Sequence, residues 1–228
     1  MLFRFRVLAV SALLLITLPL LSFKFEHPSD IVKAMKKQFK VMKSYKADFK
    51  ISVINKNRSK VSAGTAYFQS PGMINFTFSS PFGDKIISNG RTMWVYIKRM
   101  NAVGIQELDY KKKGKSIYET SSYDGLVALF RRYHYQFKDQ NQPETIEGKK
   151  YYVLKLNEKT ASGGFSDMLL YVDSETKLID RIDAFSESGR KVTLKFTNIA
   201  MNPELKQSLF RFRVEGNIKT LENPLTTE

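Results

Sequence analysis

The sequence has no cysteine among its 228 residues, and it lacks most other groups from which catalytic and metal sites are built. Without thiols there can be no disulfide, thiolate nucleophile, Cys-ligated metal or lipid-modified N-terminal cysteine. The two histidines, His27 and His134, have no companion at metal-ligand spacing. No nucleophile elbow and no phosphate-binding glycine motif occurs. We therefore expect no metal, no cofactor and no enzymatic activity.

Carboxylate pairs are the remaining catalytic candidates, because paired acids carry out glycoside hydrolysis. Three pairs stand close in the sequence: Glu107 with Asp109, Asp173 with Glu175, and Asp180 with Asp183. Each has Lys or Arg neighbours, which indicates a solvated surface. Sequence alone does not exclude that one pair faces a cleft.

Acidic residues are few relative to basic ones: 22 Asp and Glu against 37 Lys and Arg, a net charge of +15. Such a surplus attracts anionic partners. Nucleic acid is not expected, because the lysines are spread along the chain. The one cluster consists of Lys111, Lys112, Lys113 and Lys115. It is either a solvated loop or a contact with anionic lipid headgroups or an acidic partner.

The N-terminus has the pattern of an export signal. Arg4 and Arg6 precede the apolar run 7–23, and no A-x-A cleavage pattern follows it. The run is slightly short for a full membrane span, so an uncleaved anchor is the alternative to a cleaved signal. We expect a signal peptide or anchor over 1–23, one domain over 24–228, and a periplasmic location.

Two segments have helical periodicity. Ile31, Ala34, Met35, Gln38, Phe39 and Met42 share one helical face, with Ser29 or Asp30 as the N-cap. A second, shorter helix is expected over Ser121–Tyr133, with Leu126, Leu129 and Phe130 at helical spacing.

Most of the remaining chain alternates with the period of a strand. Ala47, Phe49, Ile51 and Val53 lie on one face of the first expected strand. A hairpin is expected within 79–97, with a short apolar strand before the Asn89-Gly90 turn and MWVYI (93–97) after it. Further strands are expected at 64–70, 73–78, 104–110, 134–138, 150–157, 168–173, 178–185, 191–199 and 210–214. About ten to eleven strands in meander order predict an antiparallel sandwich or barrel. Helices do not alternate with strands, so a parallel sheet is not expected.

Several of these strands are apolar on both faces, for example MWVYI over 93–97. Two short helices cannot cover so much sheet. The excess predicts either a cavity lined by apolar side chains or a barrel filled by its own side chains. The alternation places Trp94 and Tyr96 opposite Met93, Val95 and Ile97.

Two stretches together resemble a known family. GTAYFQSPGMINFTFSSPFGDKIISNGRTMWVYI (residues 64–97) and ELKQSLFRFRVEGN (residues 204–217) are similar, in order and spacing, to motifs of the periplasmic carrier proteins of the Lol lipoprotein-sorting system (LolA-type). The matching positions are Gly64, Pro71, Ile74, Asn75, Phe76, Pro81, Ser88, Asn89, Gly90, Arg91, Trp94 and Tyr96. The resemblance covers about Asp30 to Asn217. It departs from the family at Ser70, where Arg is common, at Asn89, where Asp is usual, and at Val214-Glu215, where Pro-Pro is usual.

The resemblance implies a mainly β fold with helices (α+β): a half-open antiparallel β-barrel covered by short α-helices. It also implies a carrier without enzymatic activity, which is loaded by an inner-membrane ATP-driven release complex and unloaded by an outer-membrane acceptor. A monomer that shuttles lipoprotein acyl chains between the two membranes is expected. The alternative is a related lipid-binding or sensing module that does not transport lipoproteins. The residues expected to contact the acyl chains are Met35, Phe39, Met42, Phe49, Ile74, Phe76, Phe78, Trp94, Leu126, Leu129 and Phe130.

Overall fold

The computed structural model describes residues 26–108, 123–161 and 164–222. The expected export signal and the Lys111–Lys115 cluster therefore lie outside the described residues. The first half contains α1 (Pro28–Val41), β1 (Ser44–Asn55), β2 (Arg58–Gln69), β3 (Met73–Ser80), β4 (Phe82–Asn89), β5 (Thr92–Ile97), the 3₁₀ turn η1 (Lys98–Met100) and β6 (Ala102–Glu107). The second half contains α2 (Tyr123–Arg132), β7 (Tyr133–Phe137), β8 (Glu144–Ile146), β9 (Lys149–Glu158), β10 (Asp167–Asp173), β11 (Ile179–Phe185), β12 (Lys191–Met201), the 3₁₀ turn η4 (Gln207–Phe210) and β13 (Lys219–Glu222).

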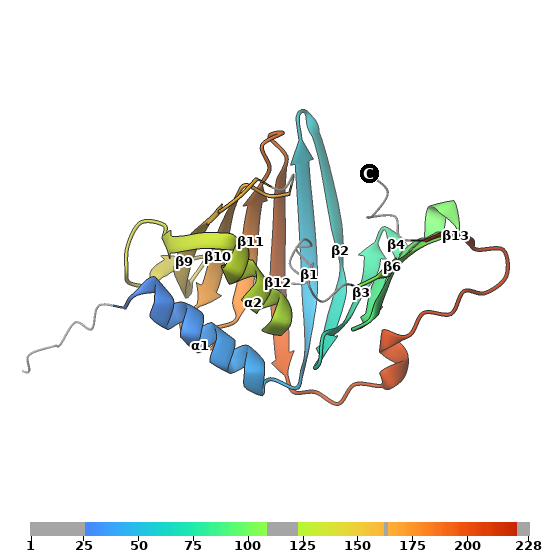
Figure 1. Cartoon of the computed structure of the whole chain (residues 1–228), viewed down its shortest axis with the longest axis horizontal. Helices are drawn as coiled ribbons and strands as arrows, with labels where there is room; N and C mark the ends of the chain where they lie inside the picture. Colours follow the sequence, from blue (N-terminus) through green and yellow to red (C-terminus); the bar gives the residue numbers. More distant parts are fainter. Residues whose placement is uncertain (1–25, 109–122, 162–163, 223–228) are drawn as a thin grey trace, which may run out of the picture.

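All described strands belong to one sheet of thirteen strands, in the order β13-β6-β5-β4-β3-β2-β1-β12-β11-β10-β9-β7, with β8 also paired to β9. The sheet is strongly curved and does not close (Figure 1). Its pairs are antiparallel, except that β13 runs parallel to β6. The expected half-open, mainly β fold with helices is confirmed. The strand count exceeds the expected ten to eleven because the short strands β8 and β13 carry too little pattern to be recognised.

Helix α1 begins two residues earlier than a cap at Ser29 would place it. Pro28 occupies its first turn and His27 is the N-cap, because proline at this position loses no helical hydrogen bond. The Asp30 carboxylate accepts a hydrogen bond from the His27 backbone N–H at 3.3 Å. The helix buries Ile31, Met35 and Phe39, as its periodicity predicts.

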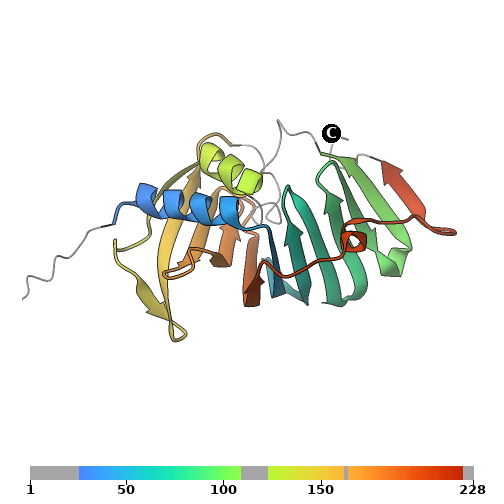
Figure 2. The ribbon, with the colours of Figure 1, turned by 90° about the horizontal axis from the view of Figure 1, so that it is seen from below.

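Both described helices lie over the same half of the concave sheet face, the half formed by β7 and β9–β12 (Figures 1 and 2). They pack against each other and against β7. Neither covers the half formed by β3–β6. No described helix is long and apolar enough to cross a bilayer.

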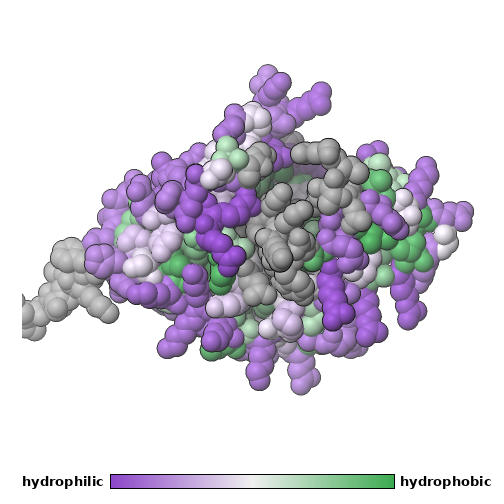
Figure 3. Space-filling model, in the orientation of Figure 1, coloured by the Kyte–Doolittle hydropathy of each residue, from purple (hydrophilic) through white to green (hydrophobic). Residues whose placement is uncertain are grey.

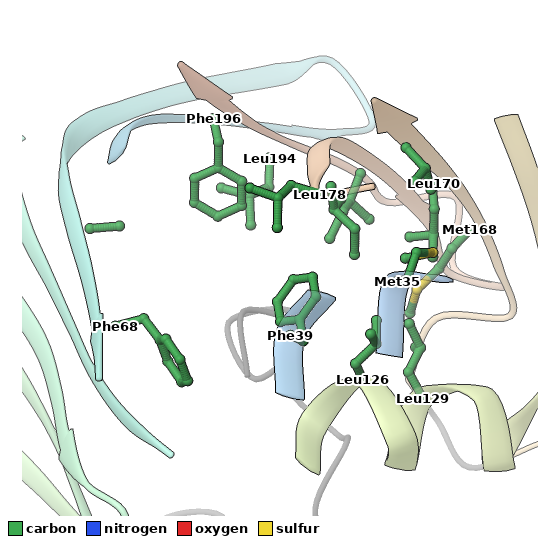
Figure 4. Close-up of a cluster of buried hydrophobic side chains, with 14 of the residues drawn as sticks. Met35, Phe39, Phe68, Leu126, Leu129, Met168, Leu170, Leu178, Leu194 and Phe196 are labelled. Carbon is green, nitrogen blue, oxygen red and sulfur yellow. The ribbon is translucent and has the colours of Figure 1, made fainter. Parts of the chain in front are cut away.

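The core lies between the helices and this half of the sheet (Figure 4). Leu154, Leu170, Ile182 and Leu194 are completely buried on the sheet side. Met35, Leu126 and Leu129 face them from the helices. Burying each such side chain contributes about 2 kcal/mol. The half of the sheet under the helices is therefore stabilised mainly by the packing of these side chains against α1 and α2.

The expected strand over 210–214 is wrong. The chain instead forms η4 and then an extended segment, which crosses the convex face of β3–β5 (Figure 2). Asn75 Nδ2 donates to the Leu209 carbonyl at 2.5 Å, and the Tyr96 and Phe212 rings lie 5.4 Å apart. Phe210 is buried. A segment lying across a sheet alternates with period two just as a strand does, so the pattern does not distinguish them.

Candidate functional site

The concave face of β1–β3 carries a cluster of aromatic side chains. Phe49 of β1 pairs with Gly64 of β2, and Gly64 pairs with Phe78 of β3, so the two phenylalanines share one face. The Phe49 ring lies 5.0 Å from the Phe76 ring and 5.0 Å from the Phe78 ring, both nearly perpendicular. Such edge-to-face contacts add to the stabilisation from burial.

Gly64, the first residue of the family-like motif, makes this arrangement possible. A Cβ atom at this position would lie 2.1 Å from the Thr77 carbonyl oxygen and 2.8 Å from the Phe78 Cα. Both contacts are with backbone, which cannot move aside locally. Glycine therefore allows β2 and β3 to approach closely at the register irregularity between Ala63 and Gly64.

The structure brings ten of the eleven expected site residues into one buried cluster. From the sheet these are Phe49, Ile74, Phe76 and Phe78; from α1 and the residue following it, Met35, Phe39 and Met42; and from α2, Leu126, Leu129 and Phe130. Each is less than 9% exposed. Their role in binding an acyl chain stays a prediction.

Trp94 is the exception, because it lies on the other face of the sheet from Phe49, Phe76 and Phe78. It pairs with Ile87 of β4 and Ile105 of β6 on the convex face, whereas Val95 pairs with Ile86 on the concave face. The alternation along β5 is thus as predicted. The convex face is apolar here because the C-terminal segment packs on β3 and β4.

Sequence reasoning missed Phe196 of β12, which joins the two ends of the cluster. Its ring lies 6.4 Å from both Tyr45 and Phe76. The signal was present, because Val192, Leu194 and Phe196 alternate along one face of β12 and all three are buried.

Asp173, Asp180 and Asp183 are buried, contrary to the expectation of a solvated surface, whereas Glu107 and Glu175 are exposed as expected. Asp183 is only 2% exposed. It accepts hydrogen bonds from Arg181 Nη2 at 2.7 Å, Thr193 Oγ1 at 2.7 Å and Tyr171 OH at 3.3 Å. Neighbouring Lys and Arg are therefore its partners within the fold, rather than signs of exposure.

A second polar group lies beside a pocket of about 370 Å³, where β11 and β12 separate beyond the pair Arg181 and Lys195. Lys149 Nζ lies 2.6 Å from Asp180 and 3.2 Å from Asp173, so one cation joins the two carboxylates. Tyr151 OH also donates to Asp180. These carboxylates are engaged by donors, which does not suit an acid–base pair. Among the described residues, no group of three His, Cys, Asp or Glu could hold a metal ion.

Asp173 gives this pocket a testable pH dependence. Burial alone would raise the pKa of Asp173, but the backbone N–H groups of Thr176 and Glu175 and the Lys149 ammonium outweigh it and lower the pKa. A carboxylate with a lowered folded-state pKa stabilises above its unfolded pKa of about 4, and the effect is lost as the pH falls through the folded value. We expect Asp173→Asn to lower the free energy of unfolding by about 1 kcal/mol at pH 7. The difference should shrink below about pH 4 in urea titrations. An equal loss at both pH values would contradict a charge effect.

The comparisons with known proteins agree with this architecture. Residues 40–213 match the family model described as "Outer membrane lipoprotein carrier protein LolA". The chain belongs to this family. Membership of the LolA family explains why the motifs at 64–97 and 204–217 occur in this order. It also agrees with an apolar concave face that helices partly cover. LolA-family carrier proteins are not enzymes.

Individual relatives cover most of the chain. An outer-membrane lipoprotein carrier protein of Methylococcus capsulatus is 23% identical over 215 residues, which are 92% of this chain and 97% of that protein. One from Legionella pneumophila is 25% identical over 182 residues, 79% of this chain and 84% of that protein. A solved structure from Thermus thermophilus, an uncharacterized conserved protein, superposes with a TM-score of 0.56 at 12% identity. It covers 85% of this chain and 98% of that one, and it shows the fold alone.

Proposed function

We propose that this LolA-family protein carries the acyl chains of lipoproteins through the periplasm, from the inner to the outer membrane. The observation that supports this most directly is the uneven covering of the concave face. Over β9–β12 the face is packed against α1 and α2, whereas no described helix lies over β3–β6. On that half the apolar face continues outward from Phe78 and Ile86 to the half-buried Val95.

Apolar side chains also reach the surface at the margin of this half. In Figure 3, hydrophobic residues reach the surface at the right-hand end of the face, over β4, β6 and β13 in Figure 1. Burial of one methylene contributes about 0.8 kcal/mol, so an acyl chain of about sixteen carbons gains roughly 12 kcal/mol when fully buried. That is enough to hold a lipid away from a membrane.

Such strong binding has a consequence for the partners. The carrier has no nucleotide-binding motif, so loading requires an energy source elsewhere and unloading requires a better acceptor. We propose an inner-membrane ATP-driven release complex and an outer-membrane acceptor in these roles, with the carrier acting as a monomer. The cluster Lys111–Lys115 remains a candidate contact for an anionic membrane surface.

The test is native mass spectrometry of the protein purified from the periplasm of its own host. We expect added masses that correspond to acylated proteins and that disappear after detergent extraction. A protein recovered from cells with abundant lipoproteins, yet always free of acylated species, would contradict the proposal.

One observation favours the second candidate, a lipid-binding or sensing module that does not transport. Where the family often has an Arg that ties the helical lid, this chain has the exposed Ser70, whose backbone N–H donates to the Lys43 carbonyl. A transfer assay from loaded carrier to outer-membrane vesicles separates the two: a carrier delivers the lipoprotein, whereas a sensor binds it and retains it.

A further inference from the structure

The β1–β2 hairpin projects beyond the rest of the sheet (Figure 1). Its two strands pair as far as Asn55 and Arg58, but the pairing of β2 with β3 already ends at Ala63 and Ser80. Residues 58–62 therefore have no neighbour in β3. We define the hairpin tip as Ile54–Val61; every residue in it is exposed.

The tip is basic and contains no acidic residue. It carries Lys56, Arg58 and Lys60, and the next hairpin places Arg190 and Lys191 beside it, since Ile54 pairs with Lys191. In the part of the chain that the structure describes, none of these five cations forms an ion pair. The charges of Lys56, Arg58 and Lys60 are therefore available to a partner outside the fold, whereas Arg190 and Lys191 lie over the Phe165 and Phe185 rings. Figure 3 shows the tip as a hydrophilic projection.

Two exposed apolar side chains accompany the charges. Ile54 is 44% exposed and Val61 is 48% exposed. The pairs Ile54 with Ser59 and Ser52 with Val61 place both side chains on one face of the hairpin, opposite Val53 and Lys60. Branched apolar side chains next to Lys and Arg are the composition of segments that lie at a membrane interface.

We propose that the hairpin tip docks onto an anionic lipid bilayer. Charge complementarity identifies the surface, and the shape of the tip favours a bilayer over an acidic peptide. A peptide that paired with the short free edge of β2 at 58–62 would use its backbone groups and not its charges, whereas the apolar and basic side chains of this narrow projection can enter the headgroup layer directly. Docking requires no bound cargo, so it is a property separate from acyl-chain carriage.

The experiment is cosedimentation of the cargo-free protein with vesicles of phosphatidylcholine alone or of phosphatidylcholine with phosphatidylglycerol. We expect binding only to the anionic vesicles, and weaker binding at high salt because screening shortens the reach of the charges. The triple variant Lys56→Gln, Arg58→Gln, Lys60→Gln should bind on the order of 100-fold more weakly, since each cation near such a surface contributes about fivefold.

The matched control removes the same charge elsewhere. Lys37→Gln, Lys40→Gln, Lys43→Gln alters exposed lysines on and just after α1, at the other end of β1, and should leave binding within a few-fold of wild type. Equal losses in both triple variants would mean that net charge alone acts, which overturns the proposal. So would a wild-type protein that ignores anionic vesicles but binds polyglutamate beads, because an acidic protein would then be the partner. The proposed carriage fails separately, by absence of acylated cargo.

Discussion

Val95→Asp is expected to abolish acyl-chain binding while leaving the protein folded. Val95 lies on the concave face of β5, beside Ile86 and on the half that no described helix covers. Because Val95 is half-buried, water can reach a carboxylate there in the empty protein. A bound acyl chain would strip that water away, at a cost of about 3 kcal/mol or more, which corresponds to at least about 150-fold weaker binding. Titration with a palmitoylated lipopeptide measures the effect.

The matched control is Val214→Asp, which introduces the same charge at a valine that is 45% exposed on the C-terminal segment. Circular dichroism should show folded protein for both variants, and only Val95→Asp should lose the lipopeptide. If Val95→Asp binds the lipopeptide as the wild type does, the uncovered half of the concave face is not where the acyl chain lies.

Asp183→Ala is expected to cause the largest loss of stability of any single charge removal described. The carboxylate is 2% exposed and accepts hydrogen bonds from Arg181, Thr193 and Tyr171. Its loss leaves a partly buried guanidinium without its counter-ion, and breaking such a pair costs about 3 kcal/mol. For a domain of this size we expect a melting temperature lower by roughly 10 °C, measured by differential scanning calorimetry.

Glu187→Ala removes the same charge from an exposed turn and should leave the melting temperature within about 2 °C of wild type. A melting temperature of Asp183→Ala that matches this control would show that the buried network contributes nothing net. In that case the desolvation of Arg181 and Asp183 offsets their attraction.

The elements with one buried face were the most predictable from sequence. In β1 the buried residues Ala47, Phe49 and Ile51 alternate with less buried ones, as the sequence pattern predicts. The period of a strand is sufficient in such a case, because only one assignment of faces hides the apolar side chains.

Prediction failed where both faces of an element are covered. On β5 the alternation separates Trp94 from Val95, but it does not state which face meets the helices. That depends on the C-terminal segment, which lies on the convex face and whose own pattern is that of a strand. The burial of Asp183 was not predicted for a related reason. In the sequence, an acidic residue close to a basic one looks the same whether the two lie on the surface or form a buried ion pair.

The place of β1 at the middle of the sheet has a consequence for how the chain folds. One partner, β2, follows at once through a tight turn, whereas the other, β12, is contributed by residues about 150 positions later, as the contact of Asp48 with Asn198 illustrates. Pairing over such separations is slow because the intervening chain must first be ordered. The central strand therefore keeps an open edge until nearly the whole polypeptide has been delivered. Late pairing of β1 with β12 suits a chain that crosses a membrane unfolded. If the C-terminal part of the chain were delayed, the unpaired edge of β1 would be the place where aggregation begins.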